Sequence, residues 1–118
     1  MKKLLPLAAV GELATGLALM AVPSLVGRLL LGQELGGVAI PLARVLGIAL
    51  LALGVACWPG LTPLCGMFTY SAGVTLYLGY VGIAGRFGGI LLWPAVIAHA
   101  IMTALLARAL ISNKEMQP

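Results

Sequence analysis

Residues 38–58 form an almost unbroken apolar run that carries one arginine, Arg44, near its start. As a helix the run would be roughly 31 Å long, which matches the hydrocarbon thickness of a bilayer. An ionised arginine within such a span costs roughly 2.5–3.5 kcal/mol on insertion scales, so it faces other helices or a wet cavity, or extends to the interface. Gly47 and Gly54 lie on its side of the helix, which predicts close packing there against another helix.

The composition also indicates a membrane protein. The chain has 118 residues, of which 62% are hydrophobic and only 8% are charged. Soluble domains carry about 25% charged residues, so this chain falls outside that class. The seven lysines and arginines are dispersed, which predicts contact with the lipid bilayer and argues against a nucleic-acid partner.

The first apolar run, residues 4–22, is interpreted as a transmembrane helix. Glu12 lies in its middle, where the apolar core of a signal peptide would be, and so argues against a cleaved leader. Continued to residue 31, the helix would be roughly 42 Å long, which is too long for an upright span. Pro23 predicts a break, with residues 23–32 as a kinked extension or a short interfacial helix that holds Arg28 among headgroups.

Two further runs, residues 67–84 and 90–110, complete the predicted fold. It is all-α: an integral membrane bundle of four transmembrane helices that forms one domain over residues 1–118. The predicted connections are residues 33–37, 59–66 and 85–89, and residues 112–118 are expected to be a frayed polar tail.

The distribution of basic residues predicts the topology. One end of the bundle would carry Lys2, Lys3, Arg108 and Lys114, and the other would carry Arg28 and Arg86. The positive-inside rule then favours a multi-pass membrane protein with both termini in the cytoplasm.

Polar residues in the four runs fall at similar depths. Glu12 lies about 12 Å from one end of its helix and His99 about 13 Å from the opposite end of its own, so they would share a level within about 5 Å. Arg44 would reach toward that level, and helix 67–84 adds Tyr77 and Thr75. The predicted polar core comprises Glu12, Arg44, Tyr70, Thr75, Tyr77, Tyr80, His99 and Thr103.

The pairing of Glu12 with Arg44 is the central hypothesis for this polar core. A lone carboxyl group in hydrocarbon stays protonated, whereas one beside an arginine can ionise. The simpler alternative is a structural network that binds nothing. No catalytic triad, phosphate loop or haem site is present, and Cys57 and Cys65 match no zinc signature, so the sequence favours neither an enzyme nor a metal protein.

The segments GELATGLALMAVPSLVGRLLLG and ARVLGIALLALGVACW, within residues 11–58, resemble small four-helix DoxX-like bacterial membrane proteins. The spacing of Arg44, Gly47, Leu51 and Gly54 carries most of the resemblance. Some members of that group are similar to subunits of quinone-linked oxidoreductases, which implies an accessory membrane subunit.

Three functional hypotheses follow from these observations. The first is a polar site that binds a quinone, a lipid or another apolar ligand, within a homo-oligomer or a larger membrane complex. The second is a dimeric proton-coupled transporter with Glu12 as the coupling carboxylate. The third is a scaffold with a sealed polar core. Access of water to Glu12 would separate the second from the third.

Overall fold

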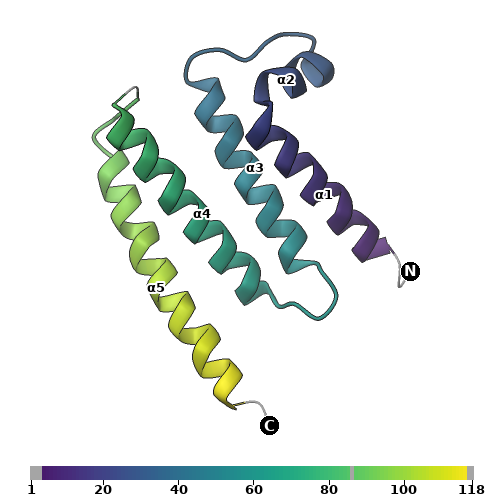
Figure 1. The fold of residues 1–118 in the computed structure, drawn as a ribbon, viewed down its shortest axis with the longest axis vertical. Coiled ribbons are helices and arrows are strands. Elements are labelled where there is room, and N and C mark those ends of the chain that lie inside the picture. Colours follow the sequence, from purple (N-terminus) through teal and green to yellow (C-terminus); the bar gives the residue numbers. More distant parts are fainter. Residues whose placement is uncertain (1–3, 86, 117–118) are drawn as a thin grey trace.

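Five α-helices make up the computed structural model, which describes residues 4–85 and 87–116. They are α1 (Leu4–Ala21), α2 (Pro23–Leu31), α3 (Ala39–Ala56), α4 (Pro63–Ala84) and α5 (Leu92–Met116), as labelled in Figure 1. The described residues contain no strand, so the all-α prediction is confirmed for this part of the chain.

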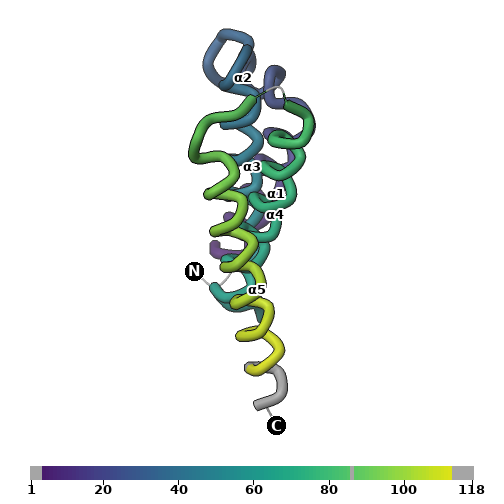
Figure 2. Tube along the Cα trace, turned by 90° about the vertical axis from the view of Figure 1, so that its left-hand side faces the viewer, coloured from purple at the N-terminus to yellow at the C-terminus, as the bar shows by residue number. Residues whose placement is uncertain are grey.

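The four long helices stand in one row, in the order α1, α3, α4, α5 (Figure 1). Each packs on its neighbour, whereas among the described residues α1 does not touch α4 or α5, and α3 does not touch α5. The molecule measures 50 × 37 × 16 Å and is one helix layer thick, as the edge-on view in Figure 2 shows. The helices therefore form an open layer, which differs from the predicted bundle in having no common interior.

The break after α1 lies where the sequence predicts it. Pro23 has no N–H to donate to the preceding turn, so α1 ends at Ala21 and Pro23 begins α2 as a new helix. Gly32 ends α2 in the left-handed conformation, with φ of 78°, and its N–H donates to the carbonyl oxygen of Arg28. The segment 23–32 is thus a separate short helix, and its position in a membrane interface stays a prediction.

Glycines bring α1 and α3 into backbone contact. A Cβ atom added to Gly47 would lie 2.7 Å from the carbonyl oxygen of Gly16, and one added to Gly54 would lie 2.6 Å from the side chain of Leu13. The prediction that the glycines of residues 38–58 face another helix is confirmed, and that helix is α1.

Two predicted boundaries are wrong. Residues 63–66 were expected in a loop but form the first turn of α4, because Pro63 occupies a helix start where its missing N–H costs nothing. Residues 112–116 were expected to be frayed but continue α5, because lysine, glutamate and methionine favour helix. The last two residues of the expected tail, 117–118, lie outside the described residues.

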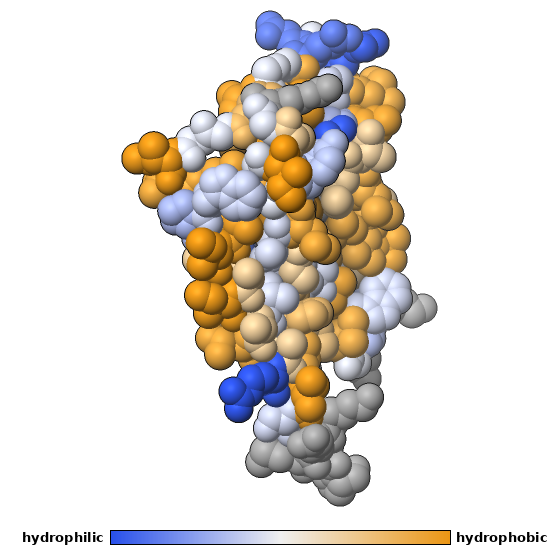
Figure 3. Space-filling model, turned by 60° about the vertical axis from the view of Figure 1, so that its left-hand side comes forward, coloured by the Kyte–Doolittle hydropathy of each residue, from blue (hydrophilic) through white to orange (hydrophobic). Residues whose placement is uncertain are grey.

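Three of the described helices are long and apolar enough to cross a membrane: Leu4–Ala21, Ala39–Ala56 and Leu92–Ser112. The face of the molecule seen in Figure 3 is largely hydrophobic over its middle, and the strongly hydrophilic residues visible there lie toward its two ends. Tryptophans lie near both ends of the layer, Trp58 after α3 and Trp93 at the start of α5. Hydrophobic sides with aromatic residues at the borders are typical of membrane proteins.

The chain reverses direction at each connection, so that α1 begins and α5 ends at the same end of the layer (Figure 1). Of the residues used to predict topology, Arg28 and Arg108 lie at opposite ends. Lys2, Lys3 and Arg86 lie outside the described residues, as does the side chain of Lys114.

Candidate functional site

Arg44 caps the end of α1. Its Nε donates a hydrogen bond to the carbonyl oxygen of Met20, at a distance of 3.2 Å. The break at Pro23 leaves carbonyl groups in the last turn of α1 without helical partners, and these form the negative end of the helix dipole. Arg44 therefore supplies both a donor and a positive charge where α1 needs them.

Arg44 also lines a cavity of about 290 Å³ between the beginning of α3 and the end of α4. Tyr77 and Tyr80 contribute from α4, and Phe87 contributes from the connection to α5. Arg44 is half-buried, and Tyr80 is 65% exposed. No hydrogen bond joins either phenol to another described residue, so both hydroxyl groups are available to a bound molecule.

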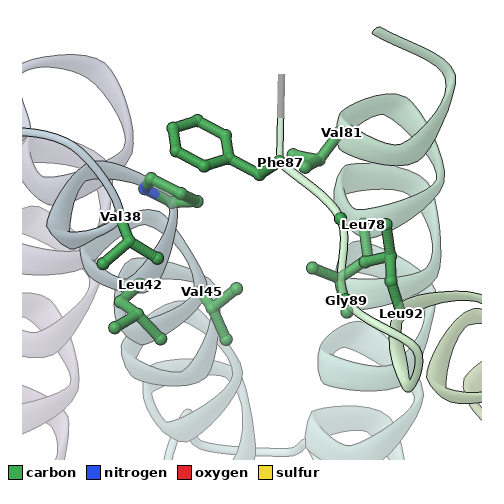
Figure 4. A pocket seen from close by; sticks show the side chains of 10 residues that line it. Val38, Leu42, Val45, Leu78, Val81, Phe87, Gly89 and Leu92 are labelled. Atoms are coloured by element: carbon green, nitrogen blue, oxygen red, sulfur yellow. The ribbon is translucent and has the colours of Figure 1, made fainter. Parts of the chain in front are cut away.

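A second cavity, of about 360 Å³, is apolar and lies on another side of α3. Its α3 lining includes Leu42 and Val45, and at about 100° per residue Leu42 points roughly 160° away from Arg44. Figure 4 shows Phe87 at the upper end of this cavity, between Val38, which directly precedes α3, and Val81 of α4. The two cavities share Pro41, Val81 and Phe87 in their walls, so they adjoin at these residues.

A separate polar contact joins α4 to α5. The rings of Tyr70 and His99 meet edge to face, with centroids 5.9 Å apart. Nδ1 of His99 donates to the carbonyl oxygen of Ala95, and the Thr103 hydroxyl donates to that of His99, each at one-turn spacing within α5. Thr75 likewise donates to the carbonyl oxygen of Ser71 in its own helix. Both threonine hydroxyl groups thus donate hydrogen bonds within their own helices, and neither threonine is among the residues that line the Arg44 cavity.

Glu12 stays apart from both groups. It lies on α1, at one edge of the row, while His99 lies on α5 at the other edge, and the two helices are not in contact. Arg44 and Glu12 form no ion pair: among the described residues, the one salt bridge joins Arg28 to Glu34. In α1, Met20 is the residue that Arg44 meets, two turns beyond Glu12.

The predicted polar core is therefore divided. Arg44, Tyr77 and Tyr80 line one cavity, Tyr70 pairs with His99, and Glu12, Thr75 and Thr103 belong to neither. The expectation that four helices converge is wrong for a single chain, because an open layer lets a helix reach only its neighbours in the row.

Sequence reasoning missed two members of the cavity region, the Met20 carbonyl group and Phe87. Pro23 signalled the first, because a proline after an apolar helix lacks the N–H that would pair with a carbonyl oxygen of the last turn. Nothing in the sequence signalled the second, since a phenylalanine in a glycine-rich connection can turn toward either side. No group of three or more metal-ligating side chains occurs within the described part of the chain.

The fold and the cavity define a small helical protein with three apolar candidate spans and an arginine–tyrosine cavity at one end. No protein-family model, no curated protein and no solved structure significantly matches this chain. The DoxX-like resemblance accordingly stays a prediction that rests on residues 11–58.

Proposed function

We propose that the chain is an integral membrane protein with four transmembrane helices, α4 being the fourth. Three helices already have the length and apolar character of spans. The remaining one, α4, has 22 residues and packs between α3 and α5, both of which are candidate spans. A helix held between two spans shares their environment, and its tyrosines and threonines account for its lower hydropathy.

The proposed topology puts both termini in the cytoplasm of a bacterial cell. Arg108 at the terminal end and the lysines near both termini motivate this orientation. Fusing a reporter after Pro118 tests it: a fluorescent protein should be bright, and an alkaline phosphatase should be inactive. An active phosphatase would reverse the assignment.

For the cavity, we propose binding of an amphiphilic ligand, such as a quinone or a lipid, by a protein that serves as an accessory membrane subunit. The observation that carries this proposal is the cavity of about 290 Å³ lined by Arg44, Tyr77 and Tyr80 at the end of an otherwise apolar surface. Such a cavity offers hydrogen-bond donors to an oxygen-bearing head group, while the hydrocarbon around it accepts an apolar tail.

The scaffold hypothesis has one observation in its favour. The hydrogen bond from Arg44 to the Met20 carbonyl oxygen gives the arginine a structural role without any ligand. A scaffold, however, does not require an open cavity beside that arginine. The transporter hypothesis rests on Glu12, which lies outside the cavity, and no observation favours it here.

Ligand binding can be tested with the purified protein in a neutral detergent. We expect a short-tailed quinone or a phospholipid to bind and to raise the midpoint of thermal unfolding. Changing both tyrosines, Tyr77→Phe and Tyr80→Phe, should reduce that shift, because each change removes one hydroxyl donor and little volume. Unchanged shifts in the double variant, or none with any amphiphile, would refute the proposed site.

A further inference from the structure

Among the described residues, no carboxylate pairs with the charge of Arg44. A guanidinium stays protonated at all physiological pH values. Of the two acidic residues whose side chains the structure describes, Glu34 pairs with Arg28 and Glu12 forms no ion pair. The Met20 carbonyl lies at the end of α1, where the helix dipole offers roughly half a negative charge. About half of the arginine charge is thus left without a counter-charge from these groups.

The cavity beside Arg44 is rich in donors and poor in negative charge. Arg44, Tyr77 and Tyr80 are among its nine described lining residues, and none of these nine is acidic. Among the described residues, one of the five N–H donors of the guanidinium is used, by the Met20 carbonyl oxygen. Gly37 and Ile40, at the start of α3, add the positive end of that helix dipole.

From this arrangement we infer that the ligand of the cavity is an anionic amphiphile, whose carboxylate or phosphate group binds between Arg44 and the two tyrosines. The inference rests on the proposed binding function and narrows its ligand class. A carboxylate or phosphate supplies the missing negative charge and accepts hydrogen bonds from several donors at once. A quinone carbonyl group supplies acceptors but no charge, so it would leave the arginine unbalanced.

Size and position agree with such a ligand. The cavity of about 290 Å³ corresponds to roughly ten water volumes, which is ample for a carboxylate or phosphate group. Arg44 lies in the second turn of α3, roughly 8 Å from the start of the helix, so its long side chain can extend toward the headgroup end of the proposed span. The exposure of Tyr80 leaves the cavity open at the side of the layer, so an acyl chain can remain among the lipids.

A matched pair of probes tests the charge directly. Oleate and oleyl alcohol have the same tail and differ in the presence of an anionic group. Phosphatidylglycerol and phosphatidylcholine both carry a phosphate and differ in net head-group charge, because choline neutralises the second. Binding of each to delipidated protein can be followed by native mass spectrometry. We expect oleate, phosphatidylglycerol or both to bind at least about tenfold more tightly than the neutral or zwitterionic counterpart, as one charged hydrogen bond provides. The anion that binds more tightly shows whether the ligand is a fatty acid or a phospholipid.

Three variants complete the test. Arg44→Gln should abolish the preference for the anion, Arg44→Lys should keep part of it, and Arg28→Gln, an exposed arginine outside the cavity, should leave it unchanged. Equal binding of oleate and oleyl alcohol, with both weakened by the tyrosine changes, would overturn the anion assignment and leave the binding function standing. Failure of all probes and of a short-tailed quinone to bind would overturn both. A preference that persists in Arg44→Gln would also overturn the assignment.

Discussion

The two outer helices of the row are held by different kinds of contact. At the seam between α1 and α3 the backbones meet, because a Cβ on Gly16 would lie 2.6 Å from the carbonyl oxygen of Gly47. At the seam between α4 and α5 aromatic rings intervene: a Cβ on Gly82 would lie 2.7 Å from the Trp93 ring. Accordingly, α1 has three buried residues, Ala9, Gly16 and Leu19, whereas no described side chain of α5 is buried.

This difference matters because the hydrophobic effect does not drive helices together within lipid. Packing and hydrogen bonds must hold them together, and small residues allow the closest packing. A backbone cannot move aside to accept an added atom, whereas an aromatic side chain can rotate. The α1–α3 seam should therefore tolerate change poorly and the α4–α5 seam should tolerate it better.

The largest loss of stability is expected for Gly47→Ala. The added methyl group would overlap the Gly16 carbonyl oxygen, so α1 and α3 must separate, at a cost of about 2–3 kcal/mol in the free energy of unfolding. Unfolding in detergent, followed by circular dichroism, measures this. Gly11→Ala on α1 is the control, since a Cβ there has no neighbour within 4 Å and alanine favours helix. Equal effects of the two changes would contradict the backbone contact.

The next largest effect is expected for Arg44→Gln, which removes the bond to the Met20 carbonyl oxygen and should cost about 1–2 kcal/mol. Glu12→Gln should cost little, and the two effects should add within about 0.5 kcal/mol, because these residues are not paired. The double-mutant cycle is measured by unfolding in detergent. A coupling well above that margin would show that Glu12 and Arg44 meet in the assembled protein.

The sequence predicted the local features of this fold well, because residues act on their own helix. Pro23 ended α1, Gly32 ended α2, and the glycines of residues 38–58 faced a neighbouring helix. The position of each residue along its helix could also be predicted from the sequence, since every residue adds about 1.5 Å to the helix. Arg44 and Tyr77 were placed at compatible depths and do line one cavity.

The order and rotation of the helices could not be predicted in this way. Helices in lipid are apolar on all sides, so no polar face shows which side is buried. Residues at one depth can therefore lie at opposite edges of the layer, as Glu12 and His99 do. The prediction that polar residues of four helices converge is wrong for this reason. Its part that concerns the adjacent helices α3 and α4 holds, because Arg44, Tyr77 and Tyr80 line one cavity.

A smaller loss of stability is expected at the α4–α5 seam, where the Trp93 ring lies between the helices. Gly82→Ala should cost about 1 kcal/mol, because the Trp93 ring can shift to make room. Gly79→Ala, on the same helix with no neighbour within 4 Å, is the matched control. The indole should also report the change as a shift in its fluorescence, and the cost should fall when Trp93→Phe leaves a smaller ring. A cost as large as that of Gly47→Ala would remove the distinction between the seams.

The smallest effect is expected at the Tyr70–His99 contact. An edge-to-face pair contributes about 0.5–1.5 kcal/mol beyond its buried area, so Tyr70→Ala and His99→Ala should show a coupling of about that size. His99→Phe should remain close to the native stability, because it keeps a ring in place and loses only the bond of His99 to its own helix. Thr103→Ala controls for hydroxyl bonds within α5. If His99→Phe proves as costly as His99→Ala, the imidazole contributes through its nitrogen atoms, and the α4–α5 seam is held by a polar contact that ring packing does not explain.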